Sequence, residues 1–295
     1  MAAGSLPIST LGKLAPSCTA SSPNCFPSPQ RHATIAHACA NAADLRRGED
    51  PMAEFHVDVT TPDGRMNCFA AHPDEGGPFP AVILYMDAPG IREELRDFAR
   101  RIAADGYFCL LPDMYYRMGQ LRFDFSMDRD NAFKLVMATM ATLSTERVMR
   151  DTAGMIDYLD GHQAVRGPYG CVGYCMSGQY VVAAAGTYPE KIVATASLYG
   201  VGIVTDKPDS PHLLAERIRG ELYLGFAETD PWVSDDVIPT LTRALEDHDV
   251  AYECEIHPDT EHGFCFPQRP AYVKDRAEIA WRKMMAMFDR RLKAA

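Results

Sequence analysis

The chain has 295 residues, 47% of them hydrophobic, which is enough for the core of one large domain or two small ones. Its formal net charge of −11 argues against nucleic acid and anionic membranes as partners, because no dense stripe of lysine and arginine is present. No apolar run approaches the ~18 residues that a membrane span needs.

The cysteines form no Cys-x-x-Cys pair and no Cys/His cluster at zinc spacing. An odd number of cysteines without such pairs is most simply explained by free thiols in the reducing cytoplasm. The same spacings lead us to expect no metal, and we expect no cofactor. The nine cysteines are Cys18, Cys25, Cys39, Cys68, Cys109, Cys171, Cys175, Cys254 and Cys265.

Residues 1–51 differ in composition from the rest of the chain. Ser, Pro, Ala and Cys recur, and no strand or helix period is sustained, so a disordered extension is expected there. Either a targeting segment or a start codon placed too far upstream of Met52 would account for it. Residues 52–295 are then expected to form a single folded domain.

Strand and helix patterns alternate from residue 52 onward. Alternating apolar residues over 55–59, turn residues over 61–64 and a second strand over 66–71 predict an antiparallel hairpin at a sheet edge. Residues 80–86 are continuously apolar, as a parallel strand covered on both faces must be. Further strands are expected at 107–111, immediately before Cys175, and at 192–198, 221–226 and 250–256, with helices at 91–105, 131–142, 145–160, 179–188, 235–247 and from about 271.

The stretch from Cys171 to Gly178 has the pattern of a strand, a sharp turn and a helix, with Cys175 at the turn. A nucleophile at such an elbow is held clear of the sheet in a strained conformation. The common form of this elbow is Gly-x-Ser-x-Gly; here a cysteine takes the place of the serine, and Ser177 stands at the second glycine. Taken alone, Cys175 could equally be a small buried hydrophobic residue.

Asp230 and His262 follow two later predicted strands. Taken singly, an aspartate there is typical of a turn or helix cap, and a loop histidine is typical of the surface. However, the carboxyl ends of parallel strands meet at one edge of a sheet, and nucleophile, acid, histidine is the chain order of α/β hydrolases. The joint pattern therefore favours a Cys175–His262–Asp230 triad.

The strand over 80–86 ends at Asp87 and Ala88, which brings a carboxylate and a backbone amide to the same edge. An oxyanion hole usually combines such an amide with the amide that follows the nucleophile, here Met176. Asp87 could serve in catalysis or as a cap for the helix that follows.

With these motifs in place, the chain from about Met52 onward resembles the dienelactone hydrolase family. The resemblance implies a single α/β-hydrolase domain: a mostly parallel sheet with helices on both faces, an antiparallel edge hairpin, a Cys-His-Asp triad and activity on enol lactones and related esters. It rests on Asp87-Ala88-Pro89-Gly90-Ile91-Arg92, Leu111-Pro112-Asp113-Met114-Tyr115-Tyr116-Arg117, Gly170 to Gly178, Tyr199-Gly200-Val201-Gly202, Gly225 with Asp230, and His262-Gly263-Phe264.

Two positions depart from the family pattern. The family typically places a glutamate at Asp87, where it contacts the resting cysteine. Arg117 resembles the first of two arginines that hold a substrate carboxylate, but the second is replaced by Phe266, with only Arg269 nearby. Because this clamp is weakened, the substrate is expected to differ from dienelactone itself.

The predicted function is hydrolysis of a small ester or lactone through a thioester on Cys175, with residues 114–130 shaping the acyl pocket and the protein a monomer or weak homo-oligomer. The alternative is a catalytically silent domain that binds a ligand, or a redox-sensing thiol at Cys175. Serine chemistry through Ser177 is disfavoured, because Ser177 lies two residues beyond the turn.

Overall fold

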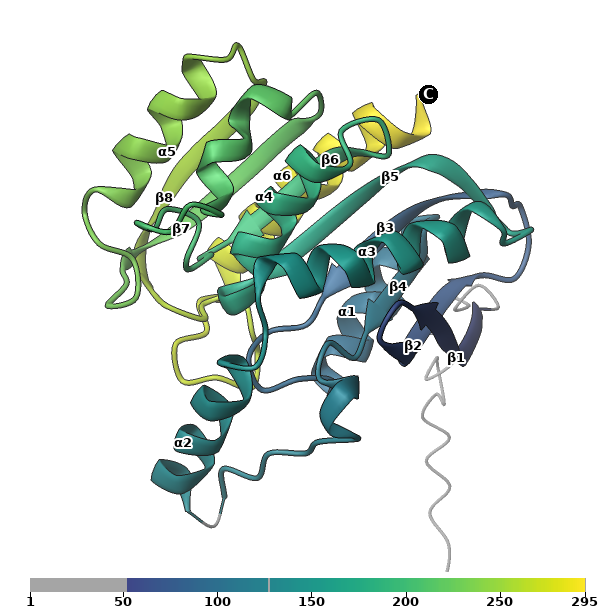
Figure 1. Ribbon diagram of the computed structural model, residues 1–295, viewed down its shortest axis with the longest axis horizontal. Coiled ribbons are helices and arrows are strands. Elements are labelled where there is room, and N and C mark those ends of the chain that lie inside the picture. The colour runs from purple at the N-terminus through teal and green to yellow at the C-terminus, as the bar shows by residue number, and fades with distance from the viewer. Residues whose placement is uncertain (1–51, 127, 295) are drawn as a thin grey trace, which may run out of the picture. The chain divides into compact units, whose positions relative to one another are not determined.

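A computed structural model of the chain describes residues 52–126 and 128–294. The expectations for residues 1–51 lie outside the described part. Eight strands form one sheet in the order β1-β2-β4-β3-β5-β6-β7-β8. Strand β2 pairs antiparallel with both β1 and β4, and all other neighbouring pairs are parallel. The α/β-hydrolase class with an N-terminal edge hairpin is thereby confirmed (Figure 1).

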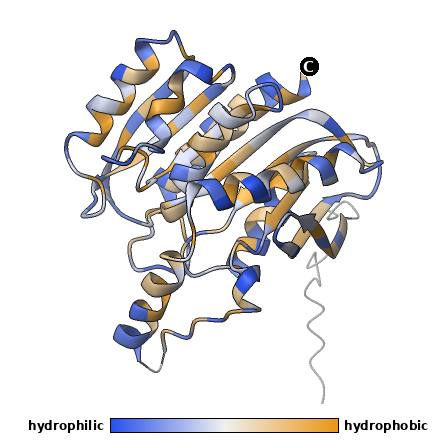
Figure 2. Ribbon diagram, in the orientation of Figure 1, coloured by the Kyte–Doolittle hydropathy of each residue, from blue (hydrophilic) through white to orange (hydrophobic). Residues whose placement is uncertain are grey.

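The edge hairpin consists of β1 (Met52–Thr61) and β2 (Gly64–Pro73), paired from Met52 opposite Pro73 to Thr61 opposite Gly64. The inner strands β3 (Phe79–Tyr85), β4 (Phe108–Pro112) and β6 (Ile192–Leu198) are buried along almost their whole length, as strands covered on both faces must be, and Figure 2 shows hydrophobic segments in orange along the middle of the sheet. Strands β5 (Val165–Tyr174) and β7 (Glu221–Thr229) are buried over 169–174 and 222–227. Strand β8 (Tyr252–Glu261) forms the other edge of the sheet and is largely polar and exposed or half-buried.

Helices cover both faces of the sheet. Helices α3 (Thr145–Asp160) and α4 (Gly178–Thr187) lie in front of it in Figure 1, and α6 (Lys274–Phe288) lies behind. Helix α1 (Glu93–Ala104) lies beside α6, because Arg101 of α1 stacks on the ring of Trp281 at 4.0 Å. Helix α5 (Val237–Glu246) packs on the 3₁₀ segment η3 (Pro211–Arg217), which contacts α4. A π-helical turn, η4 (Asp289–Lys293), follows α6.

Helix α2 (Arg129–Met140) stands away from both helical layers (Figure 1). It follows the long irregular segment after β4, in whose described residues the 3₁₀ turn η1 (Tyr116–Met118) is the only regular element. The side chain of Asp128 caps the helix by accepting a hydrogen bond from the backbone amide of Asn131 at 3.0 Å. Only Ala132, Val136 and Thr139 of α2 are buried, so most of this helix faces outward.

None of the helices in residues 52–126 and 128–294 is long and apolar enough to cross a membrane.

Candidate active site

The nucleophile elbow follows from β5. This strand ends at Tyr174, and Cys175 follows with a φ of 55°, a left-handed conformation that is rare for a residue other than glycine. A short 3₁₀ turn, η2 (Cys175–Ser177), leads into α4. A Cβ on Gly178 would lie 2.2 Å from the Cα of Gly200, so the helix can approach the next loop only through glycine. The predicted elbow is therefore present in the backbone.

Ser177 has a structural contact of its own. Its side chain is fully buried, and its hydroxyl donates a hydrogen bond to the backbone carbonyl of Met86 at the end of β3. This bond ties the elbow to the neighbouring strand, whereas the thiol of Cys175 at the same turn is free and partly exposed.

Asp230 and His262 meet at the ends of adjacent strands. Asp230 directly follows β7 and His262 directly follows β8, and His262 Nδ1 lies 2.8 Å from Asp230 Oδ2. The other carboxylate oxygen of Asp230 accepts a hydrogen bond from the backbone amide of Trp232 at 3.0 Å. Both oxygens of the acid are thus held, which fixes the orientation of the imidazole.

The environment of His262 favours its protonated form. Burial by itself lowers the pKa of the imidazole, but hydrogen bonds with Asp230 and Cys175, together with the negative charges of those two groups, raise the pKa of His262 to about 9. His262 therefore carries a proton at neutral pH. A protonated imidazole at this position could give a proton to a leaving group beside it.

Asp87 is completely buried at the end of β3, and its partners are arginines. Arg92 donates through Nη2 to Asp87 Oδ2 at 3.1 Å and also through Nη1 to Oδ1, while Arg269 donates to Oδ2. The same two guanidinium groups lie over the ring of Phe266 at 4.8 and 4.7 Å. Asp87, Phe266 and Arg269, three residues singled out from the sequence, thus share one cluster. Sequence reasoning missed Arg92, although it belongs to the motif that begins at Asp87.

Tyr115 links the two residues predicted to supply the oxyanion hole. Its hydroxyl donates to the backbone carbonyl of Ala88 at 2.9 Å and lies 3.5 Å from Met176 Sδ. Because the side chain is buried, this contact joins the loop after β3 to the elbow. Tyr115 belongs to the motif over 111–117, but no local pattern in the sequence indicates this bridging position.

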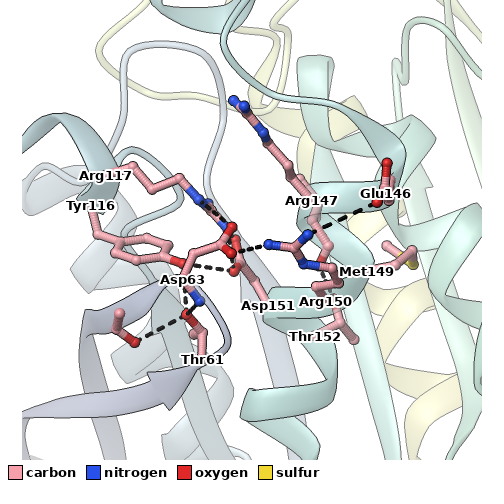
Figure 3. Close-up of polar contacts among 12 residues, drawn as sticks. Thr61, Asp63, Tyr116, Arg117, Glu146, Arg147, Met149, Arg150, Asp151 and Thr152 are labelled. Atoms are coloured by element: carbon pink, nitrogen blue, oxygen red, sulfur yellow. Dashed lines mark hydrogen bonds and ion pairs between the residues drawn. The ribbon is translucent and has the colours of Figure 1, made fainter.

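Arg117 lies in a different cluster, shown in Figure 3. Its Nε donates to Asp63 at 2.9 Å, its Nη1 to Asp151 at 2.8 Å, and its Nη2 to both carboxylates at 2.6 and 2.7 Å. Tyr116 and Arg150 donate to the same two acids. All three guanidinium nitrogens of Arg117 are therefore occupied by carboxylates of the β1–β2 turn and α3.

No group of three or more His, Cys, Asp or Glu side chains in residues 52–126 and 128–294 is arranged to hold a metal ion. The chemistry that the site offers is that of a thiol, an imidazole, a carboxylate and backbone amides.

An α/β hydrolase is defined by an elbow at the end of a strand that carries a nucleophile. An acid and a histidine follow later in the chain and pair where two further strands end. The family model described as "Dienelactone hydrolase family" matches residues 66–292. The chain belongs to the dienelactone hydrolase family.

Relatives in sequence and structure agree with this assignment. A Bradyrhizobium protein named "Probable 2-oxo-3-(5-oxofuran-2-ylidene)propanoate lactonase" is 28% identical over 79% of this chain and 92% of its own length. An Escherichia coli K12 protein named "Putative carboxymethylenebutenolidase" is 24% identical over 81% and 88% of the two chains. The crystal structure of a "Putative Dienelactone Hydrolase" from Klebsiella pneumoniae shares the fold at a TM-score of 0.72 and 22% identity, covering 81% of this chain and 98% of that one. The chain is accordingly a carboxylic ester or lactone hydrolase.

Proposed function

We propose that this hydrolase cleaves a small ester or enol lactone through a Cys175–His262–Asp230 triad and a thioester intermediate. The observation that carries the proposal is the His262–Asp230 pair at 2.8 Å, beside a cysteine that itself raises the pKa of His262. The lactonase name of the Bradyrhizobium relative supports a lactone as one substrate class.

The proposed reaction has two halves. The Cys175 thiolate attacks the carbonyl carbon, and the electron pair moves to the carbonyl oxygen, which the amides of Ala88 and Met176 stabilise. The tetrahedral intermediate collapses to a thioester as the His262 imidazolium gives its proton to the leaving alkoxide. Water then attacks the thioester, its proton passes to His262, and Cys175 leaves as thiolate, which regenerates the ion pair.

Asp87 has an electrostatic part in this proposal rather than a direct one. Its negative charge compensates Arg269 and, together with Glu94, Arg92, so that the end of β3 carries no uncompensated positive charge from these two arginines. Arg117 stays a proposed substrate-binding residue only for a substrate that displaces Asp63 or Asp151 from it.

Hydrolysis of p-nitrophenyl acetate and of a small enol lactone tests the proposal, with Cys175→Ala and His262→Ala variants measured beside the parent. We expect both variants to lose at least about 10³-fold in kcat/KM, because the nucleophile and its proton donor act as a unit. Cys254→Ala, which removes a half-buried thiol elsewhere, serves as the control and should retain parental activity.

An inactive parent with readily oxidised Cys175 would instead support a redox-sensing thiol, and equal activity in Cys175→Ala would exclude the thioester. A cytoplasmic location is part of the proposal, since the cysteines of the described residues are free thiols. A monomeric or weakly associating state stays a prediction.

A further inference from the structure

Two exposed aromatic side chains lie beside the loop that follows Asp230. Phe133 of α2 is 45% exposed and Trp232, two residues after Asp230, is 52% exposed, yet their ring centroids lie 6.2 Å apart. The backbone amide of the same Trp232 donates to the Asp230 carboxylate. The Phe133–Trp232 pair, which we call the aromatic margin, is therefore attached directly to the acid of the proposed triad.

The orientation of α2 explains why Phe133 lies at this margin. The buried residues Ala132, Val136 and Thr139 form one stripe at helical spacing, and that stripe packs inward. Phe133 is one position past Ala132, about 100° around the helix, and so borders the buried stripe. Leu135, 61% exposed, borders the opposite flank of the same stripe.

A second apolar group approaches the site from the segment before α2. Phe123 is half-buried, and its ring lies 6.4 Å from that of Tyr115, edge to face. Tyr115 in turn contacts both Ala88 and Met176. The segment between β4 and α2 thus adds an aromatic side chain beside the proposed oxyanion hole.

The three arginines Arg117, Arg269 and Arg92 are already engaged by carboxylates. Every guanidinium nitrogen of Arg117 donates to Asp63 or Asp151 (Figure 3), and Arg269 and Arg92 are paired with the buried Asp87. A substrate carboxylate would have to displace one of these acids to gain one of these arginines as its partner. An uncharged group would meet no such cost.

We propose that the aromatic margin binds the acyl chain of the substrate, and that this chain is uncharged and apolar, such as a medium-length alkanoyl or an aryl-substituted acyl group. The proposal rests on the hydrolase function above and names the substrate class of that site. Apolar contact with Phe133 and Trp232 supplies binding energy that grows with the acyl chain, at up to about fourfold for each methylene that is fully buried.

The first test compares p-nitrophenyl acetate, butyrate and hexanoate, and sets the pentanoate against the hemiglutarate, which carries a terminal carboxylate. We expect kcat/KM to rise about tenfold or more from acetate to hexanoate, and the pentanoate to exceed the hemiglutarate by about tenfold. Phe133→Ala and Trp232→Ala should each lower the hexanoate-to-acetate ratio about threefold or more. Leu135→Ala, an equally apolar change on the flank of α2 opposite to Phe133, is the matched control and should leave that ratio unchanged.

A second test needs no turnover. Alkylation of Cys175 by N-methylmaleimide and N-hexylmaleimide, followed by mass spectrometry of the Cys175 peptide, should favour the hexyl reagent in the parent and lose that preference in Phe133→Ala. Three results would overturn the inference: a kcat/KM that does not change with acyl chain length, a preference for the hemiglutarate, or an equal effect of Leu135→Ala on the hexanoate-to-acetate ratio. In each case, acetate hydrolysis that depends on Cys175 would still support the proposed function. Self-association that disappears in Phe133→Ala, with no change in the ratio, would likewise overturn it and assign the margin to a second copy of the chain.

Discussion

At the scale of single residues, His262 is governed by two partners with different tasks. Asp230 fixes the ring through Nδ1 and stabilises its positive charge, and Cys175 adds a further negative charge when it ionises. Together they outweigh the burial of the imidazole. Asp230 is therefore one of the two groups that favour the protonated form of His262, and changing it tests the proposed triad without removing the thiol.

Replacing Asp230 by asparagine removes this charge while keeping the size of the side chain. We expect kcat/KM to fall about 10²- to 10⁴-fold, because an amide stabilises neither the imidazolium nor the required tautomer. The alkaline decline of activity, expected in the parent as His262 loses its proton near its pKa of about 9, should move to lower pH. The pH dependence of kcat/KM and the titration of the His262 ring by NMR measure both effects.

Asp235→Asn is the matched control for that change. Asp235 is an exposed acid five residues further along the same loop, so it alters the charge of the chain equally without touching the imidazole. An Asp230→Asn variant whose alkaline limb stays at the parental position would show that some other group titrates there.

At the scale of elements, the helix α3 crosses the edge hairpin at unusually close range. The backbone carbonyl oxygen of Thr60 in β1 lies 2.4 Å from the position that a Cβ on Gly154 would occupy. The Asp63–Arg117–Asp151 ion pairs hold the same hairpin turn against α3 (Figure 3). The hairpin is thus fixed to the helix by a close backbone contact and by charges.

Gly154→Ala tests this contact. We expect it to lower the free energy of unfolding, whereas the same change usually raises it in a helix. In an exposed helix, alanine stabilises relative to glycine by about 1 kcal/mol. Here the new methyl group would collide with backbone, so we expect the free energy of unfolding to fall by about 1–3 kcal/mol. Urea denaturation followed by circular dichroism gives the value.

Gly161→Ala supplies the comparison at the C-terminal end of the same helix. A Cβ there would meet its nearest neighbour, the carbonyl oxygen of Asp157, at 3.5 Å, an ordinary contact. This variant should be as stable as the parent or slightly more stable. Equal destabilisation by both changes would contradict the close-contact explanation.

Strands β7 and β8 show where local patterns end too early. They were expected to end at Phe226 and Ile256, but they continue to Thr229 and Glu261. Their last residues are mostly polar and exposed, so hydrophobic periodicity gives no signal for them. Pairing with the neighbouring strand, which joins Thr229 to Glu261 after a register shift, extends both strands as far as Asp230 and His262.

At the scale of the whole molecule, two histidines make stability depend on pH in opposite directions. The pKa of His262 is raised to about 9 from 6.5, so its stabilisation is complete below pH 6.5 and is lost as pH rises through about 9. The pKa of His162 is lowered from 6.5 by burial and by His72. Its contribution is present above pH 6.5 and is lost as pH falls below that value.

The free energy of unfolding should therefore pass through a maximum close to neutral pH. Urea denaturation at constant ionic strength from about pH 5 to about pH 10 measures this curve. In His262→Gln, the free energy of unfolding should fall less steeply between neutral pH and about pH 9. Its decline at acid pH should stay the same. A parent whose stability is constant over the alkaline range would contradict the assignment of the raised pKa to the folded state.

Much of the architecture is determined by local sequence. Continuous apolar runs indicate the inner strands, alternation indicates the hairpin, and the glycine-flanked Cys175 indicates the elbow, because each depends on neighbours a few residues apart. The chain order of Cys175, Asp230 and His262 likewise follows from the sequence, and strand ends that meet at one sheet edge suffice to bring these residues together.

Only the tertiary structure decided which charges face one another. Arg117 resembles a substrate-binding arginine in sequence, but Asp63 and Asp151, 54 and 34 residues away, occupy its nitrogens. Asp87 pairs with Arg269 across 182 positions, and Phe133 meets Trp232 from another element. Side-chain ion pairs and ring contacts depend on distances of a few ångströms between remote segments, and local patterns carry no information about such distances.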